Sequence, residues 1–427
     1  MSLEPKTMKF IKKRNMLVKT SCYFLSIFAF FFIGCSSSNS SKDMLVSIDL
    51  KKIIQDEREV PISQFVDALE YIPLELTPES GISYIRKIYL TDKYIIVRHE
   101  SPGTASPLLL FDRKSGKFIR QLGKKGRGPE EYSLPLDCFY NPYDNKIYTY
   151  GSMKSSIKTY NLDGKFLESF VTPAVNEASI NKNLPVDAFL VPESFVGYIN
   201  NSTGQIAKRL VIFSKDKVIT SYPNYETWSS DQVTINQDPI FFSWGKRISF
   251  KERSNDTIFS ISMEKLIPQL VLYSSDSRYP NKLSREEAVE QITKPEDYFE
   301  TRNIFENSNY LFFDLASKFK QDEINPSSFH IIHNLCIFDK RTKSTIVCKN
   351  DENNNSCLTD DINNFISIAP ISITENNELI AVLQAIEIKK WKTENRDKSS
   401  KLNSKLPWLD KINELDNPVI VIAKCKK

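Results

Sequence analysis

One short pattern recurs five times between residues 108 and 348: an apolar or aromatic run, a polar turn and a second apolar run. Two apolar runs joined by a polar turn predict a β-hairpin. Each unit carries an aromatic anchor in its first run, and most neighbouring anchors lie about 50 residues apart, a period typical of β-propeller blades. The anchors are Phe111, Tyr160, Phe213, Phe259 and Phe338.

Turn residues support these hairpins. In the unit that begins at Ser155, the Asp163-Gly164 pair stands between two apolar runs, and this pair favours the positive φ angles of tight hairpin turns. Gly116 has the same function in the unit that begins at Leu108, after a longer loop.

The five units predict five blades, and a sixth blade follows from the apolar runs at 365–373, 378–388 and 417–423. The stretch from Leu45 to Leu76 is expected to supply the strand that closes the ring. The predicted fold is therefore all-β, a six-bladed β-propeller with short helical insertions. Seven blades is the alternative, if residues 188–225 contain a further hairpin.

Two insertions interrupt the strand pattern. Ser284 is followed three residues later by Glu287, a capping box that predicts a short helix between the fourth and fifth units. The second insertion runs from about 391 to 417 and is rich in Lys, Asn and Ser. Both are expected to decorate blades without forming a separate domain.

The N-terminus has the form of a secretory signal. Basic residues precede the apolar run Tyr23–Ile33, and Gly34-Cys35 followed by serines resembles a bacterial lipobox. The predicted domains are a signal peptide at 1–34, a lipidated tether at 35–44 and the propeller at 45–427. An uncleaved membrane anchor is the alternative, because residues 16–34 are nearly long enough to span a bilayer.

Charge and cysteine content narrow the classes of partner. Residues 1–34 hold six Lys or Arg and one Glu, so removing them changes the formal charge from +4 to about −1. A nucleic-acid partner is not expected, because phosphate binding needs a concentrated basic surface. Five cysteines remain after Cys35, and Cys336 and Cys348 flank one predicted hairpin. Buried free thiols are favoured there over a disulfide.

Four segments carry a family resemblance: GKKGRGPEEY at 123–132, SNDTIF at 254–259, DDINNF at 360–365 and DNPVIVIAKCK at 416–426. Together they resemble six-bladed β-propeller lipoproteins of Gram-negative gut bacteria, which are similar in fold to NHL and TolB-type propellers. The resemblance implies a propeller in the cell envelope and no established catalytic activity. Asn363 and Asn364 stand where glycines are common in that pattern, so the resemblance leaves a tight turn there in question.

The sharpest local motif is the glycine-rich segment 123–132. Its glycines allow a ligand to approach the backbone, and its cations attract anions. The candidate ligand loop comprises Lys124, Lys125, Arg127, Glu130 and Tyr132. The favoured interpretation is structural: a connection between blades needs the same glycines for its geometry alone, with those of the GKKGRG motif at positive φ.

Catalytic and metal chemistry find little support. The chain has three histidines, and His330 and His333 point to opposite faces of an extended strand, a poor geometry for a shared metal. The loop 351–364 contains Asp351, Asp360 and Asp361 but departs from the EF-hand pattern. No metal and no cofactor are predicted.

These observations favour a non-enzymatic envelope lipoprotein whose propeller binds a small molecule, glycan or protein partner in nutrient uptake or sensing. It is expected to be anchored by lipid, most simply in the outer membrane, on its periplasmic or surface side. A propeller enzyme of the lactonase or lyase type is one alternative, and an outer-membrane assembly scaffold is another.

The lipidation hypothesis makes a direct prediction. Cys35→Ala removes the thiol that would be acylated, so metabolic labelling with a fatty acid should be abolished in cells that produce this variant. Lipid labelling that persists in Cys35→Ala would contradict the assignment.

Overall fold

The computed structural model describes most of the chain between Leu45 and Lys426, and Leu45–Lys427 form one compact unit. The described residues are 45–100, 108–123, 126, 128, 130–131, 136–151, 156–173, 180–185, 190–201, 204–228, 232–233, 239–253, 255–277, 283–284, 286–287, 298–321, 329–351 and 356–426. Cys35 and the predicted signal peptide lie outside them, so lipidation remains a prediction.

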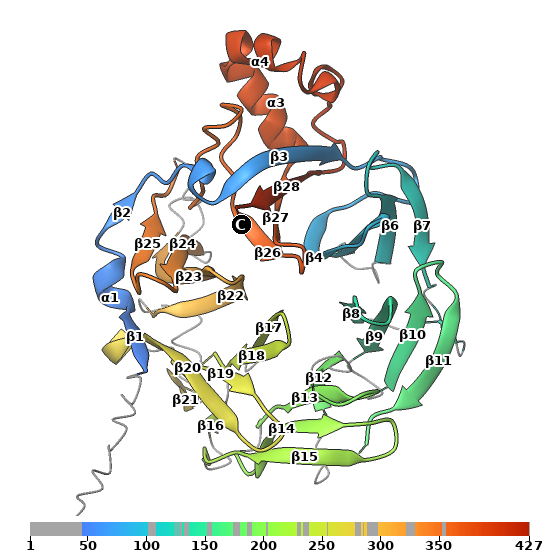
Figure 1. Ribbon diagram of the computed structural model, residues 1–427, viewed down its shortest axis with the longest axis vertical. Helices are drawn as coiled ribbons and strands as arrows, with labels where there is room; N and C mark the ends of the chain where they lie inside the picture. Colours follow the sequence, from blue (N-terminus) through green and yellow to red (C-terminus); the bar gives the residue numbers. More distant parts are fainter. Residues whose placement is uncertain are drawn as a thin grey trace, which may run out of the picture. The chain divides into compact units, whose positions relative to one another are not determined.

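The described residues form six antiparallel blades arranged in a ring, which confirms the predicted propeller and its blade count (Figure 1). Blades 1 to 3 consist of β4 (Tyr84–Leu90), β5 (Tyr94–Glu100), β6 (Leu108–Asp112) and β7 (Phe118–Leu122); β8 (Leu136–Asn141), β9 (Lys146–Gly151), β10 (Ser156–Asn161) and β11 (Phe166–Val171); and β12 (Ile180–Pro185), β13 (Phe195–Ile199), β14 (Lys208–Phe213) and β15 (Val218–Pro223).

Blades 4 to 6 follow the same plan. They consist of β17 (Ile240–Trp244), β18 (Arg247–Lys251), β19 (Thr257–Ile261) and β20 (Leu266–Tyr273); β22 (Glu300–Glu306), β23 (Tyr310–Gln321), β24 (Phe329–Asp339) and β25 (Thr345–Cys348); and β26 (Pro370–Ile373), β27 (Glu378–Leu383), β28 (Val419–Cys425) and β3 (Val66–Pro73). A small separate sheet pairs β16 (Gln232–Val233) with β21 (Leu283–Ser284).

The five repeated units are the third and fourth strands of blades 1 to 5. The anchors Phe111, Tyr160, Phe213 and Phe338 are buried, as residues packed between blades must be. Phe259 is partly buried, and the Arg209 guanidinium lies over its ring. The aromatic anchors of the sequence repeat therefore mark positions in the core between blades.

The N-terminal stretch closes the ring as predicted. Strand β3 pairs antiparallel with β28, so the last blade takes its outermost strand from the start of the domain. Both faces of this pair are buried: Ile72, Ile420 and Ile422 pack toward blade 1, and Tyr71 and Val421 pack toward blade 5.

The same stretch extends further around the rim than the sequence indicates. Strand β1 (Val46–Asp49) adds to β20 of blade 4, and β2 (Glu57–Arg58) adds to β25 of blade 5, both in parallel. Between them lie α1 (Leu50–Ile53) and, before β3, the 3₁₀ turn η1 (Ile62–Gln64). One continuous segment thus covers the outer edges of three neighbouring blades, which protects those edges from pairing with other chains.

The second insertion is helical, with α3 (Ala385–Glu394), α4 (Arg396–Leu402) and the 3₁₀ turn η3 (Pro407–Asp410). The predicted strand at 378–388 ends at Leu383, because Gln384 and Glu387 form a capping box that starts α3. The capping box of Ser284 and Glu287 is also present. No helix in the described part of the chain is long and apolar enough to cross a membrane.

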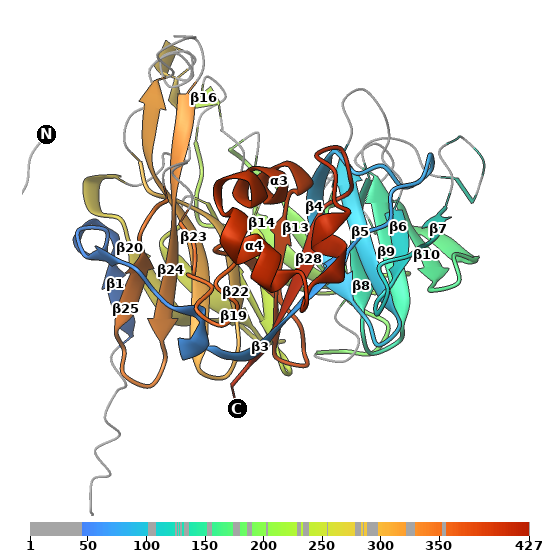
Figure 2. The same cartoon turned by 90° about the horizontal axis from the view of Figure 1, so that it is seen from above.

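The ring has two distinguishable faces. Strand β27 runs directly into α3, and β23 and β24 extend beyond their neighbours on the same side, which we call the α3 face (Figure 2). Because adjacent strands are antiparallel, the innermost strands begin at the α3 face and end at the opposite side, the turn face. The edges of the innermost strands line a central channel.

Ring closure depends on Gly116, which predicts a measurable penalty. Its φ is +69°, and an added Cβ would lie 2.0 Å from the Pro73 carbonyl oxygen at the end of β3. Gly245 also has positive φ, +56°, but open space around it. Gly245→Ala should lower the free energy of unfolding by about 1–2 kcal/mol through φ strain alone. Gly116→Ala should lower the free energy of unfolding by roughly 1–3 kcal/mol more than Gly245→Ala, because the backbone at Pro73 must also move.

Denaturant unfolding of the two variants in parallel measures this difference. Equal losses for Gly116→Ala and Gly245→Ala would show that the contact with β3 is unimportant for closure.

Candidate functional site

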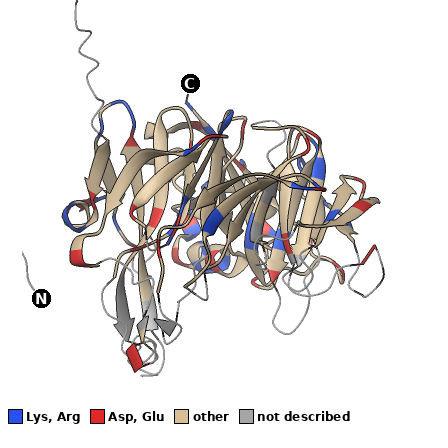
Figure 3. Ribbon diagram, turned by 90° about the horizontal axis from the view of Figure 1, so that it is seen from below, with Lys and Arg blue, Asp and Glu red and all other residues tan. Residues whose placement is uncertain are grey.

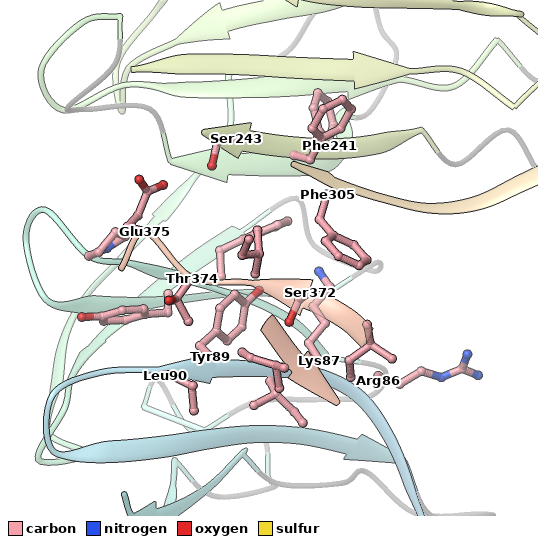
Figure 4. Close-up of a pocket in the computed structure, with 18 of the residues that line it drawn as sticks. Arg86, Lys87, Tyr89, Leu90, Phe241, Ser243, Phe305, Ser372, Thr374 and Glu375 are labelled. Carbon is pink, nitrogen blue, oxygen red and sulfur yellow. The ribbon is translucent and has the colours of Figure 1, made fainter. Parts of the chain in front are cut away.

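A cavity of about 1520 Å³ occupies the central channel (Figure 4). Side chains of the innermost strands β4, β8, β17, β22 and β26 line it. This volume exceeds the roughly 300–1,000 Å³ typical of sites for drug-sized molecules. Because five blades contribute side chains, residues far apart in sequence meet here.

Hairpin turns narrow the channel at the turn face. The Tyr143 hydroxyl of blade 2 donates to the Gly245 carbonyl of blade 4 across 3.4 Å. The Gly245 amide donates to the carboxylate of Glu375 from blade 6. The pKa of Glu375 is raised above its ordinary value, because the effect of burial outweighs the opposing effect of this hydrogen bond. Three blades therefore meet at this end, and a ligand is expected to enter from the α3 face.

Four innermost strands carry a β-bulge near their α3-face end. The strand register shifts at Arg86 in β4, Asn181 in β12, Arg302 in β22 and Ile371 in β26. A bulge adds one residue to a strand and redirects its side chain, and bulges often occur beside functional sites. Two of the redirected side chains are arginines that line the cavity, Arg86 and Arg302.

Arg302 belongs to a shared ion cluster in blade 5. The Glu300 carboxylate is almost buried, with 7% of its side chain exposed, and it accepts from Arg253 at 2.7 Å and from Arg302 at 3.0 Å. One carboxylate thus faces two guanidiniums, so the three groups together keep one positive charge. Arg302 has a 35% exposed side chain and is the more accessible of the two cations.

Arg86 lies on the blade 1 side of the cavity. Its side chain is 50% exposed, its Nε atom donates to Glu100 at 2.7 Å, and its guanidinium lies 4.8 Å from the ring centroid of Tyr84. Neighbouring Lys87 is tied to Asp137 at 2.9 Å. Lys87 thus pairs with a carboxylate of blade 2, whereas half of the Arg86 side chain is exposed and can contact a ligand.

A histidine and a carboxylate complete the wall. Nδ1 of His333 lies 3.0 Å from both carboxylate oxygens of Asp314, and both residues line the cavity. His330 and His333 were predicted to be a poor metal pair, and the described side chains contain no group of three or more His, Cys, Asp or Glu positioned around a metal. The side chain of His330 lies outside the described atoms.

Elsewhere on the described elements, Lys and Arg are interspersed with Asp and Glu (Figure 3). The cavity wall near the α3 face differs locally. Over the whole described lining, six Lys or Arg are balanced by six Asp or Glu. Near the α3 face, the charged lining residues and the residues paired with them comprise five basic side chains and four carboxylates; they are Arg86, Lys87, Arg98, Arg253, Arg302, Glu100, Asp137, Glu300 and Asp314.

The predicted ligand loop is described only in part. Lys124, Lys125, Arg127 and Tyr132 lie outside the described residues, so their role remains a prediction. Glu130 is exposed, and its carbonyl accepts from the Tyr160 hydroxyl at 3.0 Å.

The carboxylate of Glu131 organises this loop. It accepts from the Gly128 amide at 2.8 Å, and a Cβ on Gly126 would lie 1.8 Å from its Oε2 atom. Gly123 has positive φ, but Gly126 and Gly128 do not, so the expectation of positive φ at those two positions was wrong. Their small size matters because the Glu131 carboxylate packs against them.

The acidic loop that suggested calcium has a structural use. Asp360 is buried and accepts from the Tyr71 hydroxyl at 2.8 Å and from the amides of Ile362 and Asn363. Asp361 accepts from the Ser63 hydroxyl at 2.5 Å. Both carboxylates therefore fasten the loop to the N-terminal segment.

The turn questioned by Asn363-Asn364 does form. Asn364 adopts a φ of +56°, a conformation that Asn tolerates better than most residues other than Gly. Asn364 therefore serves where the related pattern has glycine.

The remaining candidates are packed inside blades. His99 is buried, and burial and then Arg98 lower the pKa of its ring. Cys336 and Cys348 are buried free thiols, and burial raises the pKa of Cys348 to about 12. Such groups are unreactive in the folded state.

Sequence reasoning missed the two channel arginines. A signal was present, because arginine is the third residue of two innermost strands, in Tyr84-Ile85-Arg86 and Glu300-Thr301-Arg302. The sequence repeat covers only the third and fourth strands of the blades, so it does not include the first strands that carry these arginines.

The loop geometry predicts that Glu131 stabilises the fold through its hydrogen bond to the Gly128 amide. Glu131→Ala should lower the free energy of unfolding by about 1.5–3 kcal/mol, the usual net value of a hydrogen bond to a charged group. Glu131→Gln keeps an acceptor oxygen of the same reach and is the matched control. Equal stability of Glu131→Ala and wild type in denaturant unfolding would count against this role.

Comparison with known proteins places the chain by fold and family. No curated protein matches it. A solved Bacteroides fragilis protein that is thought to be exported superposes with a TM-score of 0.62 at 17% identity, over 90% of this chain and 100% of that one. A member of the DUF4221 family from Bacteroides vulgatus gives a TM-score of 0.52 at 10% identity, over 84% and 97%. The profile described as Domain of unknown function (DUF4934) matches residues 45–424, and the chain belongs to this family.

Proposed function

We propose that this protein is a non-enzymatic, lipid-anchored protein of the cell envelope that binds an anionic ligand in its propeller channel, for nutrient uptake or sensing. The observation that carries the proposal is the pair of bulged arginines that line the cavity, Arg86 on blade 1 and Arg302 on blade 5, the two blades that flank blade 6. Guanidinium groups bind carboxylates, sulfates and phosphates through charge-assisted hydrogen bonds.

The groups that would bind an anion are held in place before the ligand arrives. Glu300 is buried beneath Arg253 and Arg302 and orients them, so the ligand meets guanidiniums already held in place. A partly enclosed cavity also screens these charges less than an open surface does. These features favour the channel over the glycine-rich loop, where the Glu131 carboxylate already takes the Gly128 amide.

Envelope location is supported by the N-terminal signal pattern and the lipobox-like Gly34-Cys35 pair. The fold resemblance to a Bacteroides fragilis protein thought to be exported agrees with this location. A propeller tethered through Cys35 would present its channel to solutes near the membrane. The alternative, an enzyme of the lactonase or lyase type, would use His333 held by Asp314 as its base.

Replacing one arginine tests the proposed site. Arg302→Gln should weaken binding of inorganic sulfate or phosphate by about 10-fold to 100-fold, because a hydrogen bond to a charged group contributes about 1.5–3 kcal/mol. Isothermal titration calorimetry on the detergent-solubilised full chain measures this, and the wild-type affinity should fall as salt increases.

Arg247→Gln is the matched control. Arg247 also pairs with a buried carboxylate of blade 5, that of Glu306, at 2.6 Å. When Arg247 is replaced, Lys340 still pairs with Glu306, just as Arg253 still pairs with Glu300 when Arg302 is replaced. Arg247 lies outside the cavity lining, so its replacement should leave anion affinity unchanged. Equal losses in both variants, or no anion binding by the wild type, would refute the proposed site.

A further inference from the structure

The His333–Asp314 pair adds information about the ligand that the arginines alone do not give. Asp314 as a carboxylate only accepts hydrogen bonds, and both of its oxygens lie 3.0 Å from Nδ1 of His333. Nδ1 therefore carries the ring proton, and in the neutral imidazole Nε2 is left as an acceptor. A carboxylate that fixes the tautomer of a histidine in this way is a common device at functional sites.

This acceptor is available to a ligand. His333 lines the cavity with 39% of its side chain exposed, and the only hydrogen-bond partner of its ring among the described residues is Asp314. Since Nδ1 is turned to Asp314, Nε2 is the ring nitrogen that a molecule in the cavity would meet.

The acceptor lies on the same blade as Arg302 and Glu300 and lines the same cavity. Asp314 on β23 is directly opposite Asn303 on β22, the residue that follows the bulged Arg302. The cavity wall of blade 5 therefore offers two different partners: guanidinium donors for an anionic group and an imidazole nitrogen for a hydrogen-bond donor.

We infer that the channel ligand is a hydroxy acid, whose carboxylate is held by Arg302 and whose hydroxyl donates to Nε2 of His333. This inference rests on the proposed function, since it names the class of anion that the channel binds. The cavity volume leaves room for a larger polyhydroxylated acid, such as a glycan with uronic acid residues. The half-exposed ring of Tyr84 offers an apolar surface for a sugar ring beside Arg86.

Three probes separate the contributions of charge and hydroxyl groups: inorganic sulfate carries charge alone, D-galactose carries hydroxyls alone, and D-galacturonate carries both. We expect the full chain in detergent to bind D-galacturonate at least 10-fold more tightly than D-galactose or sulfate. His333→Phe should reduce D-galacturonate affinity about 10-fold and leave sulfate affinity unchanged. Arg302→Gln should weaken binding of both anions.

Asp314→Asn tests the positioning role. An Asn side chain does not hold the proton on Nδ1 as a carboxylate does, so this variant should lose D-galacturonate affinity but keep sulfate affinity. A measurement without ligand checks the same point: ¹⁵N-labelled histidine, of which the chain has three, should give an NMR signature with Nδ1 protonated and Nε2 unprotonated for His333 above pH 8. Asp314→Asn should change this signature.

The outcomes are distinguishable. Sulfate binding that depends on Arg302, together with D-galacturonate affinity that is insensitive to His333→Phe, would overturn the hydroxy acid inference and leave the proposed anion site intact. A protonated Nε2 in the unliganded wild type at that pH would overturn it as well. Loss of sulfate binding from the wild type would instead remove the proposed function, and with it the inference.

Discussion

The pairing of β3 with β28 is the contact on which the ring depends. Seven residue pairs join the start of the domain to its end, from Val419 with Pro73 to Cys425 with Val66, across about 350 residues of sequence. Without β3, the last blade would lack its outermost strand and expose an unpaired edge. The channel exists only because this contact fixes the first and last blades side by side, so β4 and β26 can face the same cavity.

A closed ring also explains where the candidate site lies. The innermost strand of each blade has one neighbour in its sheet, so its other edge meets the channel and no sheet partner holds it in a regular conformation. A bulge is tolerated there, and Arg86 and Arg302, two of the residues added at such bulges, line the cavity. The fourth strands of blades 1 to 4 also carry a register shift, so what distinguishes the inner strands is that their free edge meets the channel.

Charged groups in this cavity are arranged around carboxylates, of which Glu300 is buried and Asp314 is partly exposed. Glu300 holds Arg253 and Arg302, and Asp314 holds His333, so each ligand-facing group has a fixed acidic partner behind it. Breaking a buried pair by removing one member is costly, because the remaining charge is left in a poorly solvated place. Arg302 is replaceable without that cost, since Arg253 stays with Glu300, and this makes it the informative position for mutation.

The sequence by itself determined the blade repeat, the closing role of the N-terminal stretch and the turns at Gly116 and Gly164, because burial between blades and hairpin geometry leave local signals in residue type and spacing. Only the tertiary structure decided that Ala385–Ile388 form part of a helix, that β1 and β2 pair in parallel with outer strands, and where the channel site lies. The physical reason is that strand register and ring closure bring distant segments together, so that Glu300 contacts Arg253 and Asp314 contacts His333. Contacts of this kind leave no periodic pattern along the chain.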